Sequence, residues 1–106
     1  MTSNSVESGS FGWGGDRPAA VRMEFFGVVG GAFVSFALER ARRLNLRGWI
    51  ADGGNRVTAH VEGAEALVGA FEMALCLGPV DANVRDWTCA ETFHERDLDG
   101  FRARQA

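Results

Sequence analysis

A short glycine-rich turn is the part of this sequence best suited to chemistry. Residues 25–36 read FFGVVGGAFVSF, an apolar run followed by two adjacent glycines and then by residues at helical spacing. Backbone amides at the start of a helix that follows glycine can surround an anion such as phosphate. An enzyme acting on that anion also needs a cation there, and this stretch contains none. Two interpretations follow, an active site or a site that has lost its chemistry.

The other reactive side chains form no recognisable catalytic or metal-binding group. His60 falls on the polar face of an expected strand and His94 in a polar segment, so both are predicted to be solvated. Neither has a second ligand at metal spacing, and we predict no metal and no cofactor. Cys76 and Cys89 are predicted to be reduced, mostly buried thiols, although a disulfide between them stays open. The proximity of Cys89, His94 and Asp97 in sequence is expected by chance.

The composition predicts one small acidic domain. The chain has 106 residues, 46% of them hydrophobic, a net charge of −3 and a pI of about 5.3. That length suits a single core, and that charge favours neither nucleic-acid nor membrane binding. No apolar run approaches the roughly 20 residues of a membrane span, and the first residues do not resemble a secretion signal. We therefore expect a cytoplasmic protein. All eleven basic residues are arginine, which indicates a GC-rich, bacterial genome.

Hydrophobic periodicity predicts the elements that position the turn. Residues 1–18 are rich in serine and glycine and are predicted to be a flexible tail, in which Phe11 and Trp13 could dock onto a groove or a partner. The domain is predicted to cover residues 19–106. Its predicted elements are strand 20–27, helix 33–44, strand 46–51, a tight turn at 52–55, strand 57–62, helix 64–77 ended by Gly78-Pro79, strand 83–89 with a bulge between Val84 and Trp87, and a short edge strand at 100–104.

This order of elements predicts the fold class. Four strands and two helices in the order β-α-β-β-α-β, with a hairpin in the middle, are typical of the α+β, ferredoxin-like plait. We expect an antiparallel sheet with both helices on one face, and a fifth strand at one edge.

Residues 21–63 resemble the acylphosphatases. That family has a turn of the form Gly-x-Val-Gln-Gly-Val-Gly-Phe-Arg, then a helix with Ala-x-x-Leu-x-Leu, then Gly-Trp-Val-x-Asn before a hairpin. The turn matches at Gly27, Val29, Gly31 and Phe33. Matches beyond the turn, which extend the resemblance to about residues 20–90, are Ala41, Leu44, Leu46, Gly48, Trp49, Val57, Glu62, Gly63, Leu75, Gly78, Pro79, Ala82 and Val84.

The resemblance implies hydrolysis of carboxyl–phosphate anhydrides without metal or cofactor. It implies a phosphate held by the backbone of the turn and by the arginine that closes the motif, while the asparagine orients the attacking water. Arginine suits this task because its planar fork meets phosphate oxygens in pairs. The anion-binding residues that the resemblance implies here are Gly30, Gly31, Ala32, Phe33 and Val34.

Both catalytic positions of the family differ in this sequence. The arginine position falls on Val34, or on Ser35 if the turn is aligned on Gly27 without a gap, and neither residue is a cation. The asparagine position falls on Asp52, and the turn and the hairpin are each one residue shorter. An arginine that stabilises phosphoryl transfer is worth about 10³–10⁵ in rate, and an ionised aspartate accepts hydrogen bonds but donates none.

The leading hypothesis is an acylphosphatase-like domain without acyl phosphate hydrolase activity, which acts as a binding or interaction module for a small anion, phosphate or a protein partner. The alternative is a divergent, active acylphosphatase that uses Asp52 and Asn55 with backbone amides. Arg56 could reach the turn, whereas periodicity places Arg22 and Arg40 on faces away from it. We expect a monomer or a weak homo-oligomer that associates through sheet edges or the tail.

A cluster of arginines follows the turn in sequence. Arg40, Arg42, Arg43 and Arg47 are expected to form a solvated helix face, with a docking patch for an acidic protein or a nucleotide as the alternative. Acidic residues that could balance this charge are Glu91, Glu95, Asp97 and Asp99.

Overall fold

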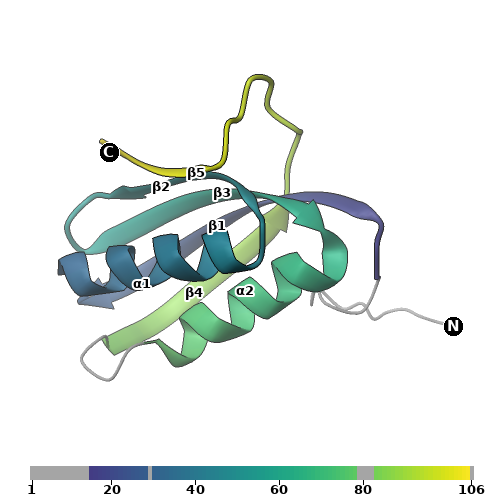
Figure 1. Cartoon of the computed structure of the whole chain (residues 1–106). Coiled ribbons are helices and arrows are strands. Elements are labelled where there is room, and N and C mark those ends of the chain that lie inside the picture. Colours follow the sequence, from purple (N-terminus) through teal and green to yellow (C-terminus); the bar gives the residue numbers. More distant parts are fainter. Residues whose placement is uncertain (1–14, 29, 79–82, 106) are drawn as a thin grey trace, which may run out of the picture.

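Two helices cover one face of a five-stranded sheet (Figure 1). The computed structural model describes residues 15–28, 30–78 and 83–105. Its elements are β1 (Pro18–Val28), α1 (Gly30–Arg43), β2 (Arg47–Asp52), β3 (Arg56–Ala64), α2 (Glu65–Leu77), β4 (Asn83–Glu91) and β5 (Phe101–Gln105). This arrangement confirms the predicted α+β plait, including the short fifth strand. None of the described helices is long and apolar enough to cross a membrane.

The sheet is mixed, which corrects the prediction of an antiparallel sheet. Its strand order is β4-β1-β3-β2-β5, and the first four strands are antiparallel to their neighbours. Strand β5 is parallel to β2. The reason is that β4 ends at the end of the sheet where β2 begins. A chain that crosses there from the β4 edge to the β2 edge must then run alongside β2 in the same direction.

The core lies between the sheet and the helices. Helix α1 buries Phe33, Ala37 and Ala41, which recur every four residues and so share one face of the helix. The Phe33 ring meets Phe25 of β1 edge-to-face, with 5.3 Å between the ring centroids. Such a pair contributes about 0.5–1.5 kcal/mol beyond the burial of its area. Side chains of α2 and β5 complete the core, and those that are fully buried are Val68, Phe71, Leu75 and Phe101.

A bulge interrupts the pairing of β1 with β4, as the sequence predicted. Phe26 lies opposite Asp86, but Gly27 lies opposite Val84, so Arg85 has no partner in the ladder. Val84 packs against the core. Trp87 is only half-buried, with 42% of its surface exposed, and its indole N–H donates to Glu72 of α2 at 3.2 Å.

The folded part extends further toward the N-terminus than the predicted tail boundary. Strand β1 begins at Pro18, and the carbonyls of Gly15 and Arg17 accept hydrogen bonds from the first two amides of α2. These bonds satisfy donors that a helix cannot pair within itself, and α2 has no side-chain cap. Phe11 and Trp13, for which the sequence left docking open, lie outside the described residues.

Gly48 provides a test of the strand pairing, because the backbone of the neighbouring strand β3 leaves no room for a side chain at this position. Its φ is +148°, and a Cβ would lie 1.8 Å from the His60 carbonyl oxygen on β3. We expect Gly48→Ala to lower the free energy of unfolding by at least about 2 kcal/mol through strain and overpacking. The measurement is urea denaturation followed by tryptophan fluorescence. Gly31→Ala is the control, because nothing lies within 4 Å of its Cβ position. Equal midpoints for the two variants would contradict this register.

Candidate functional site

Four segments meet where β1 ends. Strand β1 passes into the beginning of α1, the β2–β3 hairpin lies on one side, and the start of β4 lies on the other. The amide of Gly27 donates to the carbonyl of Asn55 in the hairpin at 3.1 Å. The glycine turn singled out in the sequence is therefore adjacent to the hairpin that carries Asp52, as the resemblance implies.

The residues predicted to bind an anion occupy the first turn of α1. Phe33 is fully buried and Val34 packs against the core from a partly buried position. Gly31 and Ala32 are exposed. Only the backbone of this turn is therefore available to a ligand. The five predicted positions are Gly30, Gly31, Ala32, Phe33 and Val34.

Asp52 closes the shortened hairpin. Its Oδ1 atom accepts a hydrogen bond from the Gly54 amide at 2.9 Å, and the Gly53 amide donates to the Arg56 carbonyl at 2.8 Å. An aspartate that accepts from the amide two residues later stabilises a tight turn. Gly54 adopts a φ of +97°, which suits glycine. The carboxylate of Asp52, which the resemblance aligns with the family's asparagine, therefore stabilises the turn.

A hollow of about 300 Å³ lies beside Gly27. Arg56, the arginine that the sequence left as a substitute for the missing cation, lies in it. Arg85, which sequence reasoning missed, lies in it too. The predicted bulge was the signal that could have found Arg85, because a bulge redirects the side chain of its extra residue. The lining residues are Phe26, Gly27, Gly53, Asn55, Arg56 and Arg85.

The two other arginines considered as substitutes lie elsewhere, as periodicity predicted. The Arg22 guanidinium lies 5.7 Å from the centre of the Trp49 ring. That of Arg40 lies 5.4 Å from the centre of the Phe36 ring on its own helix. Each makes a cation–π contact at its own site.

Comparison with known proteins decides the family. A family model described as Acylphosphatase matches residues 21–103. The chain belongs to the acylphosphatase family. An acylphosphatase of Anaeromyxobacter sp. (strain Fw109-5) is 39% identical over 80 residues, which cover 73% of this chain and 84% of that protein.

Solved acylphosphatase structures share the fold. That of Coxiella burnetii superposes with a TM-score of 0.75 at 26% identity, over 82% of this chain and 93% of that one. That of Bacillus subtilis gives a TM-score of 0.74 at 24% identity, over 83% and 99% of the two chains, and shows the fold alone. These findings confirm the resemblance on which the sequence analysis depended.

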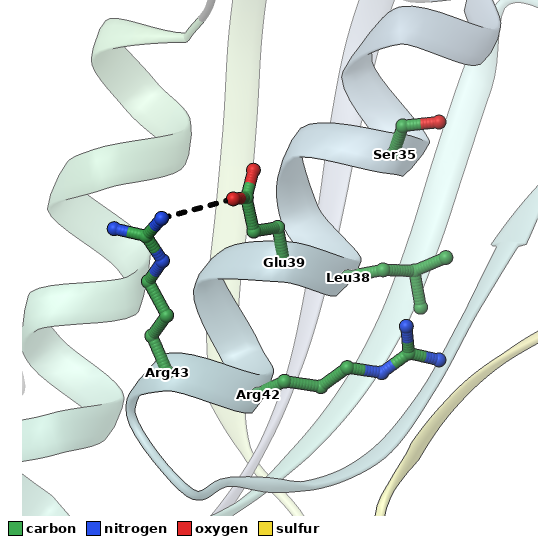
Figure 2. A pocket seen from close by; sticks show the side chains of 5 residues that line it. All are labelled: Ser35, Leu38, Glu39, Arg42 and Arg43. Atoms are coloured by element: carbon green, nitrogen blue, oxygen red, sulfur yellow. Dashed lines mark hydrogen bonds and ion pairs between the residues drawn. The ribbon is translucent and has the colours of Figure 1, made fainter.

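The arginines of the cluster that follows the turn in sequence make separate contacts. Figure 2 shows Arg42 and Arg43 leaving α1 in different directions beside a shallow hollow of about 490 Å³. Arg42 donates to the Phe101 carbonyl at 3.1 Å, whereas Arg43 pairs with Glu39 at 3.0 Å. Arg47 lies 3.9 Å from Glu62 on the other face of the sheet. The cluster therefore forms no single basic patch.

A buried polar network occupies the face of the sheet opposite the helices. Only 3% of His60 and 2% of Glu62 is exposed, so the prediction that His60 is solvated is wrong. The reason is that segment 92–99 crosses this face. His94 is exposed, yet its Nδ1 donates to Glu62 at 3.0 Å, and the Glu95 amide donates to Glu62 at 2.6 Å. The Nε2 atom of His60 donates to the same carboxylate at 2.6 Å.

Trp49 gives segment 92–99 a second attachment. Its indole N–H donates to the two carboxylate oxygens of Glu95 at 3.2 and 3.3 Å. The Arg104 guanidinium lies 4.2 Å from the centre of the Trp49 ring. Within the described ranges, no group of three or more His, Cys, Asp or Glu residues is arranged to hold a metal ion.

The two cysteines are free thiols, which answers the question of a disulfide. Burial and the nearby Glu72 carboxylate raise the pKa of Cys76 to about 11. Burial, Glu72 and the other thiol raise the pKa of Cys89 to about 12. Both thiols therefore stay protonated at neutral pH, where the thiolate would be the reactive form.

The Glu62 network predicts a large effect of one substitution. We expect Glu62→Gln to lower the free energy of unfolding by about 3–5 kcal/mol at pH 7, because it removes the charge at the centre of a buried set of donors. Urea denaturation measures the loss. Glu39→Gln is the control, since both members of its ion pair are exposed and such pairs contribute at most about 0.5 kcal/mol. Similar losses in both variants would show that the network contributes no more than an exposed pair.

The same carboxylate predicts a pH dependence. Burial acts to raise the pKa of Glu62, but the hydrogen bonds from the Glu95 amide and from His60 and His94 outweigh it, and the pKa lies below its usual value of 4.5. The stabilisation is therefore complete above that value and is lost as the pH falls through the lower pKa of the folded state. We expect the stability of the unmodified protein to fall more steeply below pH 4.5 than that of Glu62→Gln. Parallel curves would contradict this assignment.

Proposed function

We propose that this acylphosphatase-family domain binds a small phosphate-like anion and does not hydrolyse acyl phosphates. One observation supports the proposal: the two residues that the resemblance aligns with the family's catalytic positions have structural roles. Val34 packs against the core, and the Asp52 carboxylate accepts the Gly54 amide.

The physical argument concerns charge. Catalysis of phosphoryl transfer consists mostly of positioning and of stabilising negative charge, so a missing cation is costly. Valine supplies neither charge nor a hydrogen-bond donor, and the Asp52 carboxylate would add a repulsive charge near a bound phosphate. This chain therefore lacks the two groups through which the family's reaction is expected to proceed.

Arg56 does not restore the cation in its original place. It pairs with Phe26, whose neighbour Phe25 faces the helices and is fully buried. Because alternate residues of a strand point to opposite faces, Phe26 and Arg56 belong to the face opposite α1. The sheet therefore separates the Arg56 side chain from the first turn of that helix.

Features that support anion binding remain. The first turn of α1 leaves its glycine and alanine backbone exposed, at the positive end of the helix dipole. Two arginines and an asparagine line the hollow beside Gly27. We therefore assign to the domain a ligand of negative charge, while the protein partner and the cytoplasmic location stay predictions.

A second candidate function is supported by the same hollow. Because Asn55, Arg56 and Arg85 line it together, a divergent hydrolase could hold an acyl phosphate there and use Asp52 or Asn55 to orient water. In this alternative the chemistry has moved to new residues of the hairpin and of β4.

Benzoyl phosphate hydrolysis separates the two functions. We expect the purified protein to give no rate above that of buffer, because the cation and the amide are absent. The Val34→Arg, Asp52→Asn double variant restores both groups. Any hydrolysis rate that it gains would link the inactivity of the unmodified protein to these two positions. A clear rate for the unmodified protein would refute the proposal, and its loss in Asp52→Ala would establish the second candidate.

A further inference from the structure

We infer that the hollow between Arg56 and Arg85 is the binding site, and that its ligand is a phosphate dianion. This inference rests on the proposed function and deepens it. In this inference the arginines of β3 and β4 bind the charged ligand. The family resemblance instead implies that the anion binds at the first turn of α1.

The strand register brings the two arginines together. Strand β1 lies between β3 and β4, with Arg56 opposite Phe26 on one side and the bulged Arg85 beside Phe26 on the other. Neighbouring strands lie about 4.8 Å apart, so the two arginine Cα atoms are separated by about 10 Å. Two long side chains at that separation can contact one ligand placed between them.

The glycines leave the space open. Gly27 and Gly53 line the hollow without side chains, and the volume of about 300 Å³ suits a small ligand. The position of Gly27 is fixed, because its amide donates to the Asn55 carbonyl at 3.1 Å. Asn55 also lines the hollow, and its side chain carries an amide donor.

Neither guanidinium group is paired with a carboxylate among the described residues. Within residues 15–28, 30–78 and 83–105, neither Arg56 nor Arg85 forms an ion pair, whereas Arg43 pairs with Glu39 and Arg102 pairs with Asp99.

The carboxylates nearest in sequence form hydrogen bonds with backbone amides. Asp52 accepts the Gly54 amide, and Asp86 accepts the Trp87 amide at 2.9 Å. A dianion would balance the two guanidinium charges.

Phosphate fits this arrangement better than a carboxylate does. A guanidinium group binds two oxygens of one anion in a planar fork, and two forks need an anion with at least three oxygens in a tetrahedral arrangement. A single carboxylate offers two oxygens and one charge, and so would leave one arginine without a matching partner.

The test is a phosphate titration followed by proton–nitrogen NMR at low ionic strength. We expect inorganic phosphate to shift the amide signals of Gly27, Gly53 and Asn55. Arg56→Ala and Arg85→Ala should each weaken binding by about tenfold or more, because a hydrogen bond to a charged group contributes roughly 1.5–3 kcal/mol. Arg102→Ala is the matched control, an arginine of β5 that pairs with Asp99, and should leave the affinity unchanged. Thermal unfolding of each variant verifies that it is folded.

Phenyl phosphate serves as a second probe and identifies the source of the phosphate. Tighter binding than inorganic phosphate would indicate a phosphorylated organic compound, and equal or weaker binding would indicate free phosphate. Loss of affinity for both probes in the Arg56 and Arg85 variants supports the hollow in either case.

The outcomes separate this inference from the proposed function. Phosphate binding that is unchanged in both folded variants would overturn the inference and leave an anion-binding domain, with its site at the first turn of α1. No binding by the unmodified protein would overturn both the inference and the anion-binding part of the function. Hydrolysis of benzoyl phosphate together with arginine-dependent binding would refute the proposed function and retain the hollow.

Discussion

Strand β1 is hydrogen-bonded on both sides, and this constraint organises the site. Its pairing with β3 and β4 fixes Gly27 between the hairpin and the start of β4, at the point where the chain leaves for α1. Residues far apart in sequence therefore converge around one short backbone segment. The bulge at Phe26 and Gly27 is part of this arrangement, because it allows β4 to contribute a side chain that a regular ladder would have directed elsewhere.

Val34 and Asp52, which the resemblance aligns with the family's catalytic arginine and asparagine, both contribute to the fold. A valine in the first turn of α1 gains apolar contacts, and an aspartate at the end of β2 closes a hairpin that is one residue shorter than the family pattern. Each side chain has a local structural role, and neither is the group that the resemblance implies for phosphate binding and catalysis. The fold of the acylphosphatases is present, and the loss of chemistry at these two positions is part of the proposed function.

The face of the sheet opposite the helices also holds a segment of the chain in place. Segment 92–99 crosses it and is held by Glu62, which accepts hydrogen bonds from two histidines and a backbone amide, and by Trp49. A buried carboxylate is tolerable only because its oxygens are paired with donors. Segment 92–99 takes the chain across this face from the β4 edge to β5. This crossing accounts for the parallel pairing of β5 with β2.

The sequence alone determined the order of the elements, the helix-facing core, the hairpin and the bulge, because period and turn chemistry are local properties. It also predicted, through the resemblance, that no cation occupies the family's arginine position. It could not show that His60 is buried, that β5 is parallel to β2, or that Arg85 and Arg56 line the same hollow. Those facts depend on which strands become neighbours and on where segment 92–99 crosses the sheet. Tertiary structure decided them, because they arise from contacts between residues that are distant in the chain.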